Sequence, residues 1–455
     1  ELVDAPDLGS GAARRGGSSP FTRTILQLHP GPIAALRRQL QAGLALPANK
    51  SNGSAKHVLY LFLASRGQRL AKMFVSILLK KGMGVKRLLK ISTAAAGLCA
   101  IGLPASAELK YNNNTGGYVE IYGQFNPAII SVDDGQQTET NLLDNDLSRS
   151  RVGLRLMQPI GANTFGFRFE AGLGFPNSTE VNQFGSNYSG WTRADLRHVD
   201  FWLEGSWGKL STGQGSMVAD GAAETDLSYV GTALYSYTAD ANAGFLFRDT
   251  AGALSGPAVA SAFDNLDGSR RGRIRYDTPD FNGFSAGLAW GKNVLSSSDD
   301  ADYYDIGLRY GQEFGSTSFA ASLAYQVRDD AGAERSDVIG SASVLLDNGL
   351  SFTMAGGTRD NDAAGASDPS YYYAKIGYEN EWLAWGKTGF GLHYYDGDDF
   401  NVTGSSTKGW GIGAVQKVEN LNTDIYLTYQ EYEYRDAAAS YQDLTTWVLG
   451  ARWKF

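Results

Sequence analysis

Residues 445–455 read TTWVLGARWKF, and this stretch decides how the rest of the chain is interpreted. Apolar side chains alternate with small or polar ones along it, which is the two-residue period of a β-strand. One parity carries Trp447, Leu449, Ala451, Trp453 and Phe455. The pattern runs to the final aromatic residue, whereas chain ends usually fray into loose polar residues. We therefore expect this strand to be paired along its whole length.

The same alternation recurs upstream, in segments separated by breaks rich in Gly, Asp, Asn and Ser. In SFAASLAYQV (318–327), for example, large apolar residues alternate with small or polar ones. Counting such segments predicts sixteen strands: 118–130, 149–159, 163–173, 196–206, 209–214, 270–277, 283–291, 302–312, 316–328, 335–346, 350–359, 370–380, 386–396, 407–418, 422–434 and 443–454.

The breaks between these strands are alternately short and long. Short turns at one end and long loops at the other, over an even number of strands, are typical of an up-and-down transmembrane β-barrel. Many of the 24 tyrosines and 9 tryptophans lie near predicted strand ends, as interfacial aromatic belts do. A soluble β-sandwich is the alternative. The barrel is favoured because the polar face combines Arg and Glu with many small residues, which suits a wet interior. In lipid, closure would require the last strand to pair with 118–130.

The front of the chain carries an export signature. Residues 83–107 have a basic head, an apolar run from 91 to 103 and Ala105-Ser106-Ala107, the order of a Sec signal peptide. We expect cleavage between Ala107 and Glu108. Residues 1–82 are basic and lack sustained periodicity, so we interpret them as an over-extended start, without a domain. The single predicted domain is then 108–455.

Charge and rare residues exclude several kinds of function for 108–455. Fifteen of the chain's 40 basic residues and three of its 48 acidic residues precede residue 108, which leaves a net charge of −20. A nucleic-acid partner is not expected, because binding phosphates needs a basic surplus. The only cysteine, Cys99, lies in the leader, so no disulfide framework is expected. Two histidines remain, His198 and His393, which excludes a His/Cys metal cluster.

These features resemble the general porins of Gram-negative bacteria. The resemblance covers 108–455 and rests on the leader, the strand count, the terminal GARWKF, and stretches such as SRSRVGLRL and FWLEGSWGKLSTGQ. The sequence ETDLSYVG (224–231) is similar to the alphaproteobacterial type. The resemblance implies a homotrimeric outer-membrane channel in which the long third loop folds into the lumen. It also implies that the barrel-assembly machinery reads Trp447, Leu449, Ala451, Trp453 and Phe455. A candidate trimer contact comprises Val119, Ile121, Leu444 and Trp447.

Strand parity predicts the lining of the channel. We name the inward arginines the arginine wall: Arg149, Arg151, Arg155, Arg168, Arg271, Arg273 and Arg275. The long segment after 209–214 supplies three acids, Asp220, Glu224 and Asp226. A basic wall facing an acidic loop would set selectivity by a field across the constriction. The alternative is a structural role, in which each arginine pairs with a nearby carboxylate and braces the wall.

Other readings of the chain remain open. The acidic clusters VDDG (132–135), SSSDDAD (296–302) and YDGDDF (395–400) suit Ca²⁺, which prefers oxygen ligands, or bridging to lipopolysaccharide, but none fits a defined calcium motif. No other cofactor is expected. A substrate-selective channel would need an aromatic slide, whereas Trp202, Tyr303, Tyr373 and Tyr395 are scattered. A barrel enzyme such as a phospholipase would need a His-Ser pair facing lipid.

Overall fold

The computed structural model describes residues 109–186, 188, 190–330 and 333–455. The strands in these ranges are β1 (Leu109–Asn112), β2 (Tyr118–Phe125), β3 (Pro127–Asp133), β4 (Thr138–Asp144), β5 (Arg151–Ile160), β6 (Asn163–Gly172), β7 (Val181–Asn182), β8 (Gly185–Ser186), β9 (Leu196–Gly205), β10 (Gly208–Ser216), β11 (Arg270–Asp277), β12 (Phe284–Lys292), β13 (Asp302–Phe314), β14 (Thr317–Asp330), β15 (Ala333–Leu345), β16 (Leu350–Asn361), β17 (Ser370–Leu383), β18 (Gly386–Asp398), β19 (Ser406–Val418), β20 (Thr423–Arg435) and β21 (Leu444–Lys454). The helical turns are α5 (Val259–Ala262), η1 (Asp146–Ser148), η2 (Ser178–Glu180), η3 (Arg193–Asp195) and η4 (Glu419–Leu421).

Two regions interpreted from the sequence lie outside these ranges. They are segment 1–82 and the leader 83–107 with its cleavage residues Ala107 and Glu108. Among the helices that the structure describes, none has the length and apolar character needed to cross a membrane.

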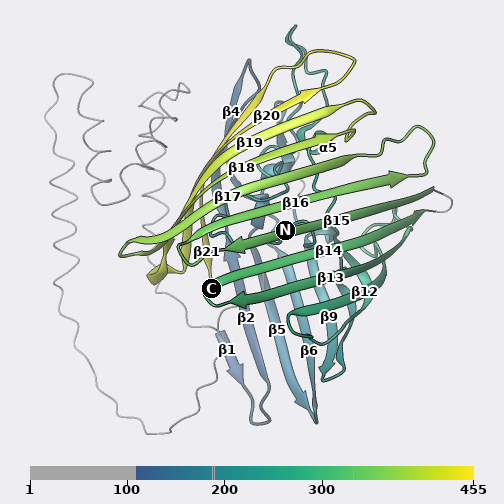
Figure 1. The fold of residues 1–455 in the computed structure, drawn as a ribbon, viewed down its shortest axis with the longest axis vertical. Coiled ribbons are helices and arrows are strands. Elements are labelled where there is room, and N and C mark those ends of the chain that lie inside the picture. Colours follow the sequence, from purple (N-terminus) through teal and green to yellow (C-terminus); the bar gives the residue numbers. More distant parts are fainter. Residues whose placement is uncertain (1–108, 187, 189, 331–332) are drawn as a thin grey trace, which may run out of the picture. The chain divides into compact units, whose positions relative to one another are not determined.

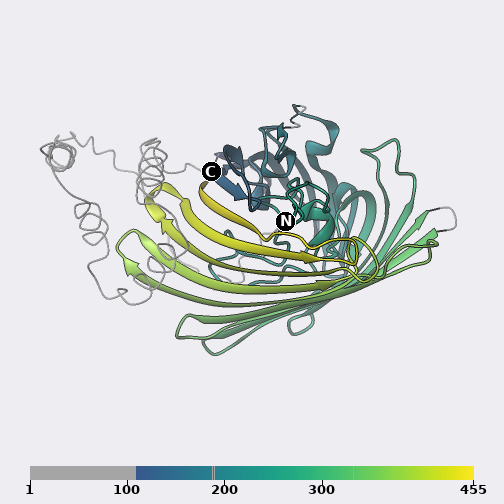
Figure 2. The ribbon, with the colours of Figure 1, turned by 90° about the horizontal axis from the view of Figure 1, so that it is seen from above.

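Sixteen strand positions in the described chain close into one antiparallel barrel (Figures 1 and 2). β2 and β3 share the first position, and β5, β6 and β9 to β21 fill the others, each paired with its neighbour in chain order. Closure comes from β21, which pairs with β3 from Thr445–Asp133 to Gly450–Ala128 and with β2 at Phe125–Trp453. The predicted strand count and the predicted pairing of the last strand with the first are both confirmed.

The first barrel position is interrupted at Asn126, which the sequence did not indicate. The side-chain amide of Asn126 donates to Ser148 O at 2.9 Å, and its backbone N–H donates to Ser150 Oγ at 2.9 Å. Before this break in the chain β2 pairs with β5, and after it β3 pairs with β4. β4 and the end of β3 thus lie in 131–148, which the sequence suggested was a plain loop, since Thr138–Asp144 has too few large apolar residues to be recognised as a strand.

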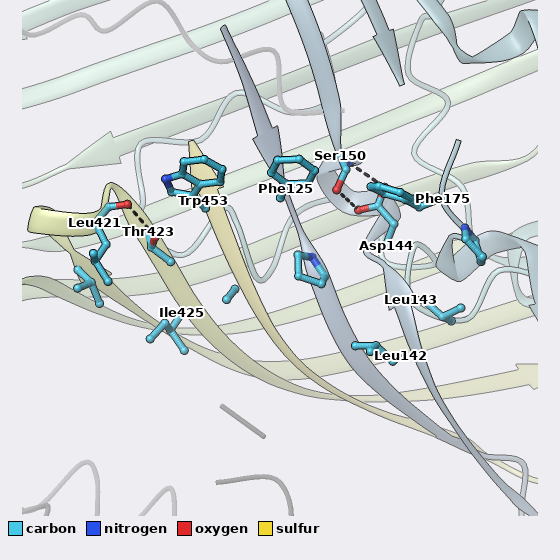
Figure 3. A pocket seen from close by; sticks show the side chains of 14 residues that line it. Phe125, Leu142, Leu143, Asp144, Ser150, Phe175, Leu421, Thr423, Ile425 and Trp453 are labelled. Carbon is cyan, nitrogen blue, oxygen red and sulfur yellow. Dashed lines mark hydrogen bonds between the residues drawn. The ribbon is translucent and has the colours of Figure 1, made fainter. Parts of the chain in front are cut away.

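The seam is sealed by backbone hydrogen bonds and outward-facing aromatic rings. Gly123 and Phe455 exchange both backbone hydrogen bonds, at 2.9 and 3.0 Å. The Phe125 ring stacks on Trp453 at 5.7 Å between centroids, and Trp453 contacts Phe455 at 4.9 Å. An apolar groove of about 530 Å³ follows this seam on the outer side of the wall, and Phe125, Leu142, Ile425 and Trp453 are among its lining residues (Figure 3). The final strand is therefore held along its whole length.

Alternation gives the wall two chemically distinct sides. On adjacent strands, Ile274, Leu288 and Ile306 are 52%, 57% and 56% exposed, whereas their neighbours Arg273 and Asp305 are 5% and 7% exposed. The outer side is thus apolar and the inner side polar, as a barrel in lipid requires. One residue of the candidate trimer contact was assigned to the wrong side. Leu444 is 1% exposed and packs within the buried core, because it has the opposite parity to Trp447.

Closure at the seam depends on a residue without a side chain. A Cβ at position 123 would lie 2.5 Å from the Phe455 ring and 2.7 Å from Arg151 O. We expect Gly123→Val to prevent β21 from docking, so that heat-modifiable migration of the detergent-folded protein is lost. Gly356→Val is the matched control, since its nearest contact would be 3.1 Å away. Normal folding of the Gly123 variant would contradict this account of the seam.

Candidate functional site

The arginines of the first strands are paired with carboxylates on the inner side of the wall. Arg151 is 6% exposed, and its Nε lies 3.6 Å from Glu170 Oε1. Arg155 Nη1 lies 3.3 Å from Glu120 Oε2 and keeps two fifths of its side chain exposed. Arg149 precedes β5 instead of lying on it, since it caps η1 and bonds to Asp146. Of the three side chains, that of Arg155 is therefore the most exposed to the barrel interior.

Asp200 on β9 joins two strands of the arginine wall. Arg168 on β6 approaches both of its carboxylate oxygens at 3.2 Å, and Arg273 Nη2 on β11 approaches Oδ2 at 2.8 Å. Arg273 also donates to the carbonyls of Gly213 and Ser216. One buried carboxylate thus fixes two guanidinium groups, which leaves a net positive charge at this point.

The remaining members of the arginine wall, Arg271 and Arg275, lie beside the two ends of the long segment 217–269. Arg275 is held by Asp277 at 2.7 Å and donates to Met217 O at 2.6 Å. Arg271 places its guanidinium over the Tyr303 ring, 4.0 Å from the centroid. Arg275 therefore ties the start of segment 217–269 to β11.

The three predicted acids of segment 217–269 go to different partners. Asp220 Oδ2 lies 4.0 Å from Nη1 of Arg270, which begins β11 but is not a member of the arginine wall. Glu224 is buried and accepts from Asn265 Nδ2 at 3.3 Å. Asp226 instead forms an ion pair with the fully buried Lys375 on β17, and it accepts from Thr353. Asp226 thus anchors the segment and does not face the arginines.

Burial changes the titration of acids in this segment. Desolvation raises the pKa of Glu224, and the nearby Asp220 charge adds to the increase. The pKa of Asp267 is also raised well above its usual value, chiefly by burial and then by Glu224 and Asp220. These carboxyls therefore hold protons at pH values where ordinary carboxyls are ionised.

Segment 217–269 has its own apolar contact with β17 to β21. Phe263 packs against Tyr395 and Tyr432 at 5.2 Å, and Phe247 packs against Tyr434 at 5.5 Å. Hydrogen bonds reinforce this contact, since Tyr432 donates to Thr238 O and Asn242 to Thr446, while Tyr229 donates to Asp424. Two of the scattered inward aromatic residues, Tyr373 and Tyr395, are 1% and 0% exposed, so they are packing residues here.

Several residues of the site were missed from the sequence. Asp200, Lys375 and Asp305 share inward parity with residues that were identified, so parity alone could have added them as candidates. The partner of Lys375 could not have been found, because the pair Asp226–Lys375 joins distant parts of the chain.

Neither histidine forms part of a recognisable catalytic group in the described residues. His393 Nδ1 lies 3.3 Å from Tyr373 Oη, and His198 is 5% exposed on β9. Among the described residues, no three His, Cys, Asp or Glu side chains gather in a way that could hold a metal ion.

The comparisons identify the family. The family model described as Gram-negative porin matches residues 92–437, about three quarters of the chain. The chain belongs to the Gram-negative porin family. It therefore forms a diffusion channel in the outer membrane. A search of curated proteins found no match.

Solved structures share the porin fold. An anion-selective porin from Comamonas acidovorans is 21% identical, with 74% of this chain and all of that chain covered and a TM-score of 0.50. OmpF of Salmonella typhi, solved with daunomycin, is 15% identical, with 76% and 100% covered and the same score. In-vitro folded OmpT of Vibrio cholerae is 12% identical, again with 76% and 100% covered and a score of 0.50. At these identities the likeness extends to the fold alone.

The buried ion pair between Asp226 and Lys375 anchors segment 217–269 to β17, and this role can be tested. We expect Lys375→Met to leave Asp226 charged and unpaired, a loss of about 3–5 kcal/mol for a broken buried pair. The segment would detach from β17, which single-channel recording would detect as a noisier current. The double variant Lys375→Met/Asp226→Leu should be quieter, since no charge is stranded. A current from Lys375→Met as steady as that of the parent would rule out this anchoring role.

The raised pKa values predict a pH dependence of ion preference. Unperturbed carboxyls titrate at about pH 4. As the pH falls, Glu224 and Asp267 should therefore take up protons before that pH is reached, because their pKa values are raised. Loss of these negative charges should reduce cation preference, measured as reversal potential in a KCl gradient from pH 8 to pH 4. Glu224→Gln with Asp267→Asn should remove the early part of this change. An identical pH profile in that variant would contradict the assignment.

Proposed function

We propose that this porin passes ions and small hydrophilic solutes passively, and that the arginine wall facing an acidic segment sets its selectivity. In this proposal segment 217–269 folds into the lumen and narrows it. A sixteen-stranded barrel is too wide for wall side chains to fill, so it leaves an aqueous channel. The contact between Asp220 and Arg270 carries the proposal, because it brings the acidic segment to β11, the strand that also carries Arg271, Arg273 and Arg275.

The charge arrangement favours a transverse field over a simple braced wall. Arg168 and Arg273 share the single carboxylate of Asp200, so they retain positive charge. Asp267 and Glu224 lie in the segment that Arg275 and Arg309 hold through its backbone carbonyls. A field of this kind would orient dipolar solutes and disfavour apolar ones.

A substrate-selective channel is the weaker alternative. It would need aromatic rings along the water-filled path, whereas Tyr373 and Tyr395 pack beneath segment 217–269. The family's known function is solute passage, so we propose no enzymatic activity for this chain.

We further propose that the porin is a homotrimer, exported through the periplasm with residues 83–107 as a signal peptide cleaved between Ala107 and Glu108. The apolar groove beside Phe125 and Trp453 on the outer wall supports a contact there between subunits. In this proposal the assembly machinery reads the terminal strand, and acidic rim clusters bind Ca²⁺ or lipopolysaccharide.

Planar-bilayer recording tests the proposed selectivity. Arg151→Ala with Arg155→Ala should shift the reversal potential in a KCl gradient toward the potassium equilibrium potential, because two positive charges leave the wall. Arg435→Ala is the control, since it removes a charge that is 72% exposed at the rim beside Glu433. An unchanged reversal potential in the double variant would remove these arginines from the constriction. A channel closed to small sugars would refute general diffusion.

A further inference from the structure

A second polar site lies on the long-loop side of the barrel, away from Arg151 and Arg168. It is a pocket of about 200 Å³. Its lining comes from the long-loop ends of β11 and of β13 to β16, and from the two ends of segment 217–269. Its lining includes four arginines and four aspartates, so their formal charges cancel. Pockets for drug-sized ligands measure about 300–1,000 Å³, so this one suits a smaller polar solute.

Some of these charged groups are already neutralised within the wall. Arg359 makes a two-pronged pair with Asp337, at 2.6 and 3.2 Å, and Gln326 donates to the same carboxylate at 2.7 Å. Arg328 is held by Asp330 at 2.7 Å and donates to Tyr303 Oη. These groups build the pocket and have little capacity left for a solute.

Asp267 is likewise occupied. Its two oxygens accept the backbone N–H groups of Gly221 and Ala223 at 2.6 and 2.7 Å. It therefore closes a turn in segment 217–269 and is a poor candidate for binding a cation.

Three groups in the pocket retain unused hydrogen-bonding capacity. Asp305 is 7% exposed; one oxygen accepts the Ala219 N–H at 2.8 Å, and the other has no partner within the described chain. Arg335 approaches its nearest carboxylate, Asp337, only at 4.0 Å, and its Nε has no hydrogen bond. Arg271 lies over the Tyr303 ring and donates from Nη1 to Ser269 Oγ and to Arg270 O, whereas its Nε has no partner within the described chain. Buried polar groups without partners call for an explanation, and a ligand is one.

We propose that this pocket is a binding subsite for a small zwitterion of the amino-acid or dipeptide type, on the path into the channel. Arg271 and Arg335 receive the carboxylate, since guanidinium groups match carboxylates in shape and charge. Asp305 receives the ammonium group. Because the groups with unused capacity carry both signs, a solute with a carboxylate and an ammonium group matches them better than a simple anion or a simple cation does. This subsite rests on the proposed channel function, because it lies on the lumen wall.

Calorimetric titration of the detergent-folded porin tests the subsite without requiring conduction. Glycylglycine should bind saturably, whereas acetate and methylammonium, each carrying one of its charges, should bind at least tenfold more weakly. Acetate binding as tightly as glycylglycine would overturn the zwitterion assignment, and so would the absence of saturable glycylglycine binding. Both comparisons use the unmodified protein, so neither depends on whether a variant folds.

Variants locate the site. Arg335→Gln and Asp305→Asn should each weaken glycylglycine binding roughly tenfold or more, the loss expected for a hydrogen bond to a charged group. Arg435→Gln, at the exposed rim, should bind as the parent does. Unchanged affinity in both pocket variants would overturn the proposal. Conductance in KCl alone is measured separately, so a failure of the channel proposal is distinguished from a failure of the subsite.

Discussion

The structure depends on the closing of one sheet. An unpaired backbone N–H or C=O in hydrocarbon costs several kcal/mol, so a strand edge cannot be left open there. β21 removes the last edge by pairing with β2 and β3, and Phe455 exchanges both backbone hydrogen bonds with Gly123. Once the sheet is closed, each strand has only two sides to offer. Apolar residues such as Leu288 face outward, and charged residues such as Arg273 face inward.

Closure also creates an interior that the side chains of the wall cannot fill. The two sides of this interior, lined by β5 to β11 and by β17 to β21, differ in chemistry. β5 to β11 carry arginines paired with a few buried carboxylates such as Asp200. β17 to β21 carry tyrosines that pack against Phe247 and Phe263 of segment 217–269. The ion pair Asp226–Lys375 fixes the segment on the aromatic half. In the proposed function, water and solutes then follow the arginine half.

The fold was largely predictable because a closed sheet repeats one rule, the alternation of side chains. That rule gave the strand count and the sides of Arg273 and Ile274. The rule failed for short segments whose structure depends on local hydrogen bonds, and for contacts between residues far apart in the sequence. The strand 138–144 is too polar to show a period, and Arg149 was assigned to a strand although it caps a turn with Asp146. No pattern in the sequence joins Asp226 to Lys375, because that contact depends on the path of a long segment.

Cysteine accessibility tests the central claim most directly. Cys99 is the only cysteine, so single cysteines can be placed in a Cys99→Ser background without interference. The measurement is the reaction rate of a charged, water-soluble thiol reagent with the membrane-reconstituted protein. We predict rapid reaction at Arg155→Cys on the arginine half, and none at Leu288→Cys on the outer side or at Tyr432→Cys beneath segment 217–269. Equal reaction at positions 155 and 432, or none at 155, would contradict a channel that follows the arginine wall.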